Sequence, residues 1–148
     1  MAQITVEVLR TVKGSPEQVM SVLADYAGAR AELWPEMITD YRVTEGGQGA
    51  GTRISYRLHA TRRRVREVDA VVTAPEEGCL LESDQRSSLR TRWKVRPAAA
   101  GSSTVSVTTS WAGAGGVGGF FEKTFAPIGI RKLYNAVLDG LENRLGRS

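Results

Sequence analysis

The sequence predicts an α+β fold in which a seven-stranded antiparallel sheet wraps around one long C-terminal helix. The first observation is that residues 37–112 consist almost entirely of short segments in which apolar and polar side chains alternate, as in antiparallel strands with one buried face. The second is an amphipathic helical pattern that follows a glycine-rich segment, residues 113–119. Because a sheet must bury its apolar face against another element, we expect this helix to lie across the sheet.

The apolar residues of the C-terminal helix recur at spacings of three and four, which is the period of one helix face. They are Phe121, Phe125, Ile128, Ile130, Leu133, Tyr134, Val137, Leu138, Leu141 and Leu145. Pro127 within this pattern predicts a kink or a restart of the helix. Since the helix could not bury this face alone, we expect residues 1–148 to form a single domain.

The N-terminal elements follow from local signals. Ile4, Val6 and Val8 alternate with polar residues and predict the first strand. Ser15 is expected to cap a helix that begins at residue 16, with Gln18 completing a capping box. A second short helix is expected over residues 28–33, because the proline at position 35 disfavours a helical conformation at position 34.

Six further strands are expected over residues 38–45, 52–60, 63–74, 80–85, 89–97 and 104–112. Glycine-rich or proline-containing segments separate several of them, as in successive hairpins. The predicted order is therefore one strand, two short helices, six strands and the long helix.

Composition and charge exclude several classes of protein. The net charge of +4 is modest for a nucleic-acid binder, so no DNA partner is expected. The single cysteine, Cys79, cannot form an internal disulfide. No run approaches the roughly 18 apolar residues of a membrane-spanning helix. We expect a cytoplasmic protein, either a monomer or a homodimer.

Three short motifs carry a resemblance to a known family. They are residues 12–19 (VKGSPEQV), residues 33–37 (LWPEM) and residues 46–53 (GGQGAGTR). With the order of elements, they resemble the START-like, or helix-grip (SRPBCC), superfamily and, within it, the polyketide cyclase/dehydrase-like group. The resemblance implies a hydrophobic tunnel between the sheet and the C-terminal helix. Members bind lipids, sterols, polyketides, plant hormones or quinones, and a minority are enzymes.

Large apolar and aromatic side chains should converge on the predicted tunnel. The expected wall residues are Tyr56, Leu58, Trp93, Trp111, Phe121, Phe125 and Tyr134, with Trp34 and Met37 at the mouth. The same residues could instead simply fill a core. If they bind a ligand, the hydroxyls of Tyr56 and Tyr134 are the first candidates to orient it, and replacing Trp93 or Phe125 by Ala should weaken binding.

Catalytic and metal-binding chemistry is poorly represented. His59 is the only histidine, and the alternation of its strand places it on the outer face. With one histidine and one cysteine, no metal site is expected, and the sequence indicates no cofactor. Acid–base pairs could involve Glu67, Asp69, Glu82 or Asp84, although none has a diagnostic spacing, so catalytic residues stay unassigned.

Arginines concentrate at residues 62–66, which include Arg62, Arg63, Arg64 and Arg66. This cluster is typical of a solvated hairpin that discourages edge-to-edge aggregation. The alternative is contact with an anionic partner. Basic residues at positions 90, 92, 94 and 96 would extend the patch.

Three hypotheses about function follow. The leading one is binding, and possibly transport or sequestration, of a hydrophobic small molecule such as a lipid, polyketide or quinone between the sheet and the C-terminal helix. The alternative is a polyketide cyclase/aromatase or dehydratase on the same scaffold, so enzymatic activity stays open. The third is a protein or RNA interaction module that uses the arginine-rich surface.

Overall fold

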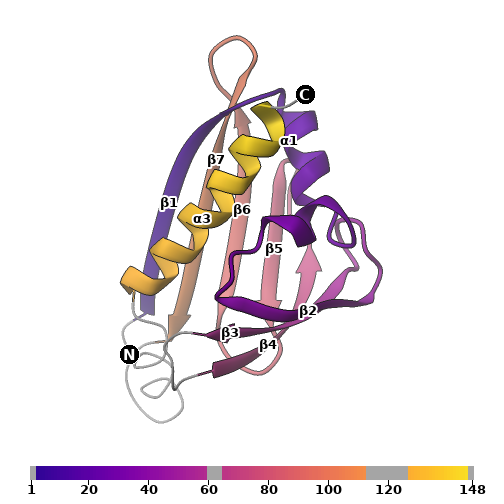
Figure 1. The fold of residues 1–148 in the computed structure, drawn as a ribbon, viewed down its shortest axis with the longest axis vertical. Coiled ribbons are helices and arrows are strands. Elements are labelled where there is room, and N and C mark those ends of the chain that lie inside the picture. Colours follow the sequence, from indigo (N-terminus) through magenta and orange to yellow (C-terminus); the bar gives the residue numbers. More distant parts are fainter. Residues whose placement is uncertain (1–2, 60–64, 113–126, 147–148) are drawn as a thin grey trace.

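The structure is a computed structural model that describes residues 3–59, 65–112 and 127–146. Its elements are β1 (Gln3–Lys13), α1 (Pro16–Leu23), the 3₁₀-helix η1 (Ala29–Leu33), β2 (Ile38–Glu45), β3 (Arg53–His59), β4 (Val65–Thr73), β5 (Cys79–Asp84), β6 (Arg90–Pro97), β7 (Ser102–Ala112) and α3 (Pro127–Gly146) (Figure 1). The predicted order of one strand, two short helices, six strands and a long helix is confirmed.

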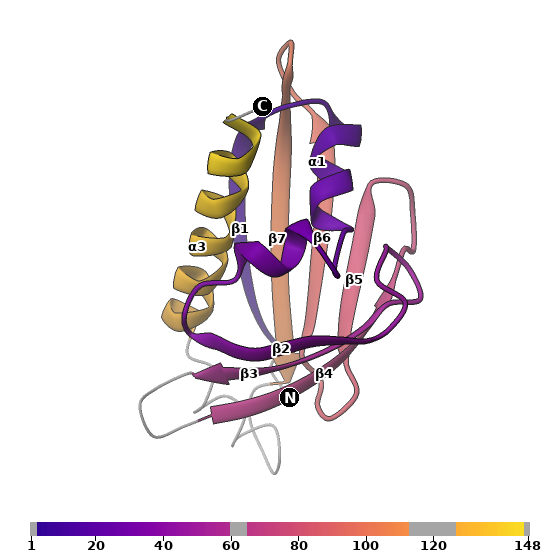
Figure 2. The ribbon, with the colours of Figure 1, turned by 45° about the vertical axis from the view of Figure 1, so that its right-hand side comes forward.

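The strands form one sheet in the order β1-β7-β6-β5-β4-β3-β2, and every neighbouring pair is antiparallel. The sheet is strongly curved: Figure 2 shows β2, β3 and β4 crossing the lower part of the molecule while β1, β7 and β6 run upright. In β3, Ile54, Tyr56 and Leu58 are buried on the inner face, whereas Arg57 is exposed on the outer one. The predicted seven-stranded antiparallel sheet around a C-terminal helix is therefore confirmed.

The helix α3 packs along β1 and against η1. Its buried residues are Ile130, Leu133, Tyr134, Val137, Leu138 and Leu141. The sequence analysis also placed Ile128 on this stripe, and that expectation is wrong, because the side chain is 83% exposed in the first turn. The helix begins at Pro127, where the missing N–H of proline breaks no intrahelical hydrogen bond. Phe121 and Phe125 lie outside the described residues.

Polar contacts hold α3 to the rim of the sheet. Arg10 of β1 forms ion pairs with Asp139 and Glu142, and its Nη2 donates a hydrogen bond to Asn135 Oδ1 at 3.0 Å. Arg131 donates to the carbonyl of Glu7 at 2.9 Å. These contacts are largely exposed, so each one stabilises the fold modestly.

A second set of contacts joins α3 to η1. Arg144 pairs with Glu32 at 2.9 Å. The backbone of α3 also approaches η1 closely, since a Cβ placed on Gly140 would lie 3.4 Å from Leu33 Cδ2. The short helix η1 therefore touches the C-terminal half of α3 through both a charge pair and an apolar contact.

The predicted capping box of α1 is present. The Gln18 backbone N–H donates to Ser15 Oγ at 3.2 Å, and the Ser15 N–H donates to Gln18 Oε1 at 2.8 Å. Between α1 and η1, the Asp25 carboxylate accepts hydrogen bonds from the Ala29 N–H and from the Gln48 side chain. These bonds fix the position of η1, because they tie the segment that leads into it to the β2–β3 hairpin.

The strand β2 contains an irregularity that the sequence did not predict. Its register against β3 shifts between Thr39 and Arg42, and Asp40 has a φ of 54°. Asp tolerates this left-handed conformation better than most residues. Next to it, the Tyr41 hydroxyl donates a hydrogen bond of 2.7 Å to the carbonyl of Tyr26. The irregularity therefore lies where β2 is fastened to the segment after α1.

Candidate functional site

The predicted wall residues that the structure describes lie in the core between the concave side of the sheet and α3. Tyr56, Leu58, Trp93, Trp111 and Tyr134 are all at most 5% exposed. Trp34 and Met37 are half-buried and pack against the same core.

The described aromatic rings form two groups. Trp34 contacts Tyr56 and Tyr41, with ring centroids 5.2 and 5.9 Å apart. In the second group, Trp93 of β6 and Tyr134 of α3 lie edge to face, with ring centroids 5.6 Å apart. This contact joins β6 to α3.

A buried arginine lies between these two groups. Arg30 of η1 is 0% exposed, and its guanidinium carbon lies 4.3 Å from the ring centroid of Trp93. The same carbon lies 4.9 Å from the ring of Tyr26 and 5.2 Å from that of Trp34. Each distance is within cation–π range, and such contacts strengthen when water is excluded. The guanidinium therefore connects the short helices to β6.

Arg30 is paired with a buried carboxylate on the sheet. Its Nη2 donates to Glu82 Oε2 at 2.8 Å, and its Nη1 donates to the carbonyl of Leu23 at 3.0 Å. The Arg30 Nε is buried and has no partner among the described residues. Burial alone would lower the pKa of the guanidinium, but the charge of Glu82 outweighs this effect and the pKa is raised.

Glu82, on β5, is 4% exposed and receives a second hydrogen bond. The Tyr26 hydroxyl donates to the same Oε2 at 2.6 Å. Oε1 accepts no hydrogen bond within the described part of the chain. Burial, together with the charge of Glu82, raises the pKa of Tyr26 well above its ordinary value. The phenol therefore stays protonated and serves as a donor.

The two tyrosines expected to orient a ligand differ in their surroundings. The hydroxyl of Tyr134 lies 3.1 Å from Thr91 Oγ1, which lies 3.1 Å from Thr109 Oγ1, and burial raises the pKa of Tyr134 to about 12. Burial also raises the pKa of Tyr56, with smaller contributions from neighbouring groups that include Glu82. The Tyr56 hydroxyl makes no hydrogen bond to another described residue. Tyr134 is thus tied to the sheet, whereas Tyr56 has hydrogen-bonding capacity left.

Sequence reasoning named Glu82 only as one of four acidic candidates and missed Arg30 and Tyr26. A signal was present in β5, where Glu82 and Asp84 share the inward face with Leu80. Charged residues on a buried face need partners, so these positions indicated a buried cation or hydrogen-bond donors somewhere else in the chain. Asp84 accepts bonds from the Asp69 N–H and from the β5–β6 turn.

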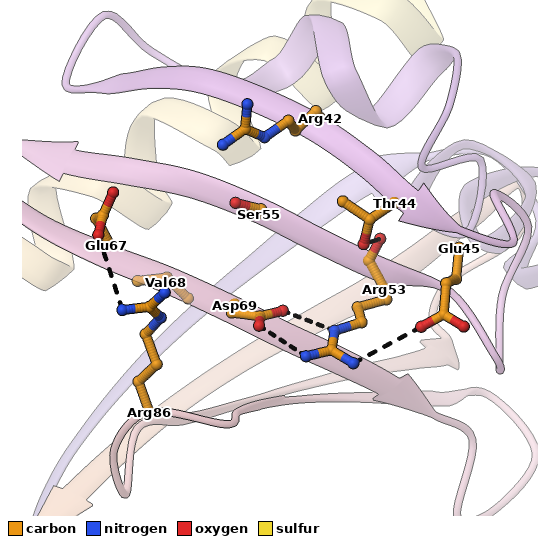
Figure 3. A pocket seen from close by; sticks show the side chains of 9 residues that line it. All are labelled: Arg42, Thr44, Glu45, Arg53, Ser55, Glu67, Val68, Asp69 and Arg86. Atoms are coloured by element: carbon orange, nitrogen blue, oxygen red, sulfur yellow. Dashed lines mark hydrogen bonds and ion pairs between the residues drawn. The ribbon is translucent and has the colours of Figure 1, made fainter.

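Two of the other acidic candidates lie on the outer face of the sheet. A groove of about 480 Å³ there is lined by Arg42, Thr44, Glu45, Arg53, Ser55, Glu67, Val68, Asp69 and Arg86 (Figure 3). Arg53 forms two hydrogen bonds of 2.8 Å with Asp69, which lowers the pKa of that carboxyl, and lies 3.7 Å from Glu45. Glu67 lies 3.8 Å from Arg86. Because its carboxylates are paired with arginines, this groove is a poor candidate for acid–base chemistry.

A larger groove, of about 720 Å³, lies between α1, the β4–β5 turn and the end of β6. It is lined by Pro16, Glu17, Met20, Ser21, Ala24, Glu77, Gly78, Val95 and Pro97. None of these lining residues is aromatic or belongs to the predicted ligand site. The groove is therefore separate from the aromatic cluster.

The structure describes only part of the predicted arginine-rich surface, and it also places His59. Arg62, Arg63 and Arg64 lie outside the described residues, while Arg90 and Arg96 are exposed on β6. His59 is half-buried, with Nε2 2.7 Å from Thr39 Oγ1.

Within residues 3–59, 65–112 and 127–146, no cluster of His, Cys, Asp or Glu side chains could hold a metal ion. No helix in these same ranges has the length and hydropathy to cross a membrane.

A family model and several solved structures are similar to this chain. A family model described as "Polyketide cyclase / dehydrase and lipid transport" matches residues 3–146. The NMR structure of the KanY protein is similar, with 40% identity, 99% of both chains covered and a TM-score of 0.88. A START superfamily protein from Mycobacterium smegmatis has 14% identity over 97% of each chain and a TM-score of 0.71. The Zhui aromatase/cyclase from Streptomyces sp. R1128 has 17% identity over 99% of this chain and 95% of its own, with a TM-score of 0.70. Comparison with curated protein sequences gives no match.

Proposed function

Since the chain belongs to the polyketide cyclase/dehydrase and lipid transport family, as the sequence resemblance predicted, we propose that it binds a hydrophobic or amphipathic small molecule between the sheet and α3. The observation that carries the proposal is the aromatic cluster on the concave side of the sheet, where Trp34 meets Tyr56 and Trp93 meets Tyr134. Such rings offer large apolar contact area with hydroxyl groups at defined points. We expect the protein to act in the cytoplasm as a monomer or homodimer.

Burial of apolar ligand surface would supply most of the affinity, at about 25 cal/mol per Å² before the costs of association are subtracted. Tyr56 is the first choice for a polar contact, because its hydroxyl has no partner among the described residues. The further wall residues of the proposed site are Met37, Leu58, Trp111, Phe121 and Phe125.

Titration with apolar probes tests the proposal. Tryptophan fluorescence should change saturably when naphthalene, a fatty acid or a quinone is added, because Trp34 and Trp93 lie in the proposed site. Tyr56→Phe should weaken binding of the quinone severalfold and leave naphthalene binding nearly unchanged. Ser55→Ala, one residue away on the outer face of β3, is the matched control and should change neither. Absence of saturable binding for all three probes would refute the proposed function.

A second candidate function is polyketide cyclisation or dehydration on the same scaffold. It is supported by the buried network of Tyr26, Arg30 and Glu82, which places a proton donor and a carboxylate inside the fold. Buried acid–base groups of this kind are typical of sites that move protons.

Turnover of a model poly-β-keto thioester tests this second function. Wild-type protein should accelerate ring closure or loss of water, and Glu82→Gln should reduce the rate at least tenfold. Glu67→Gln, an acidic residue on the outer face, is the control and should retain the full rate. A rate equal to the uncatalysed reaction would eliminate the enzymatic alternative and leave the binding function standing.

A further inference from the structure

The inner face of the sheet carries a carboxylate oxygen whose role the fold alone does not explain. Glu82 Oε2 receives both hydrogen bonds, from Tyr26 at 2.6 Å and from Arg30 at 2.8 Å. Oε1 accepts none from the described residues, although a carboxylate can accept about four hydrogen bonds in total. Glu82 is only 4% exposed, so little solvent reaches this oxygen, and we expect a ligand donor to complete its hydrogen bonding when the site is occupied.

The carboxylate is held rigidly in one orientation. Arg30 is fixed by the carbonyl of Leu23 and by the ring of Trp93 at 4.3 Å. The backbone of Tyr26 is held as well, because its carbonyl accepts the hydrogen bond of Tyr41. Groups that are locked before binding lose little entropy when a ligand arrives, so Oε1 is a preorganised acceptor.

The surroundings of the pair also limit which ligands it can accept. The Arg30 guanidinium lies against three aromatic rings and already neutralises Glu82, so little positive charge is left for a ligand, although its Nε–H has no partner among the described residues. A ligand carboxylate near Oε1 would place two like charges together with little water to screen them. A neutral hydroxyl would instead complete the hydrogen bonding of the carboxylate.

We propose that Glu82 Oε1 is the polar anchor of the ligand site, and that the site selects neutral ligands with a hydroxyl or phenol group over their methylated or carboxylated analogues. The inference rests on the proposed binding function and specifies its substrate class. The alternative is that the Arg30–Glu82 pair only fastens η1 to the sheet, in which case it has no influence on ligand choice.

Four matched probes separate these possibilities with the wild-type protein. They are naphthalene, 2-naphthol, 2-methoxynaphthalene and 2-naphthoate, each titrated by calorimetry at neutral pH. A hydrogen bond to a charged acceptor should make 2-naphthol bind about tenfold or more tightly than 2-methoxynaphthalene, and 2-naphthoate should bind weakest. Equal affinity for 2-naphthol and 2-methoxynaphthalene would overturn the anchor while leaving the binding function intact. Failure of all four to bind would overturn both.

Two variants assign the preference to this residue. Glu82→Gln keeps the shape of the side chain, and it should reduce the preference for 2-naphthol severalfold. Because Glu82→Gln leaves Arg30 without its counter-charge and could fail to fold, the double variant Arg30→Leu/Glu82→Leu removes both charges together. It should still bind naphthalene saturably but lose the preference for 2-naphthol over 2-methoxynaphthalene.

The matched control is Arg53→Leu/Asp69→Leu, which removes an Arg–carboxylate pair from the outer face of the sheet. It should keep the wild-type preference for 2-naphthol. Retention of that preference in Arg30→Leu/Glu82→Leu would show that another group is the anchor and would refute the inference.

Discussion

Arg30→Met is expected to lower the free energy of unfolding by about 3–5 kcal/mol, because it leaves the charge of Glu82 buried without a counter-charge. Arg30 is 0% exposed and Glu82 is 4% exposed, so water cannot compensate for the lost partner. The substitution also removes the hydrogen bond to the carbonyl of Leu23 and the contact with the ring of Trp93. Urea denaturation followed by circular dichroism measures the loss.

Two comparisons isolate the cause. Arg53→Met breaks the Arg53–Asp69 pair at the surface and should have a far smaller effect, since water can solvate the carboxylate that is left. Arg30→Leu/Glu82→Leu should recover most of the stability lost in Arg30→Met, because neither charge then stays buried alone. If the double variant were as unstable as Arg30→Met, the unpaired charge would not be the reason for the loss.

Trp93→Ala is expected to cost about 3–5 kcal/mol of stability and to abolish most ligand affinity. Trp93 is 0% exposed, lies edge to face with Tyr134 and supports the guanidinium of Arg30. Its truncation removes a large apolar group and leaves a cavity beside the proposed ligand site. Thermal unfolding measures the first effect, and titration with 2-naphthol measures the second.

The cavity itself provides the control. Indole should raise the melting temperature of Trp93→Ala more than that of the wild type, because it can occupy the space of the missing side chain. Trp93→Phe keeps one aromatic ring and should fall between the wild type and Trp93→Ala in both measurements. Full stability and unchanged affinity in Trp93→Ala would contradict the position of this side chain at the centre of the core.

The fold could be predicted because its signals are local and repeated. Alternation along β3 and β6 identified the inward residues, such as Tyr56 and Trp93, and the capping box at Ser15 located the start of α1. The prediction was wrong for Ile128, since helical periodicity identifies a face but does not reveal where that face extends beyond the sheet. The irregularity at Asp40 was missed, because a single inserted residue leaves the pattern of polar and apolar residues nearly intact.

The candidate site was harder to predict because it depends on a pairing across the fold. Arg30 lies in a five-residue 3₁₀-helix, which is too short to show a periodic apolar face. Its partner Glu82 lies on another element, 52 positions away in the chain. The aromatic residues could be named from their strands, whereas the charge that connects them became visible only when η1 was placed against the sheet.

The position of η1 has a consequence for how ligand binding and the packing of α3 depend on each other. Its Arg30 reaches the interior carboxylate, while its Glu32 and Leu33 meet Arg144 and Gly140 of α3. Five consecutive residues thus contact both the proposed ligand site and α3. Any ligand that shifts η1 must also alter the packing of α3 against it. Thermodynamic linkage then requires that weakening this packing alter the affinity for the ligand by the same factor.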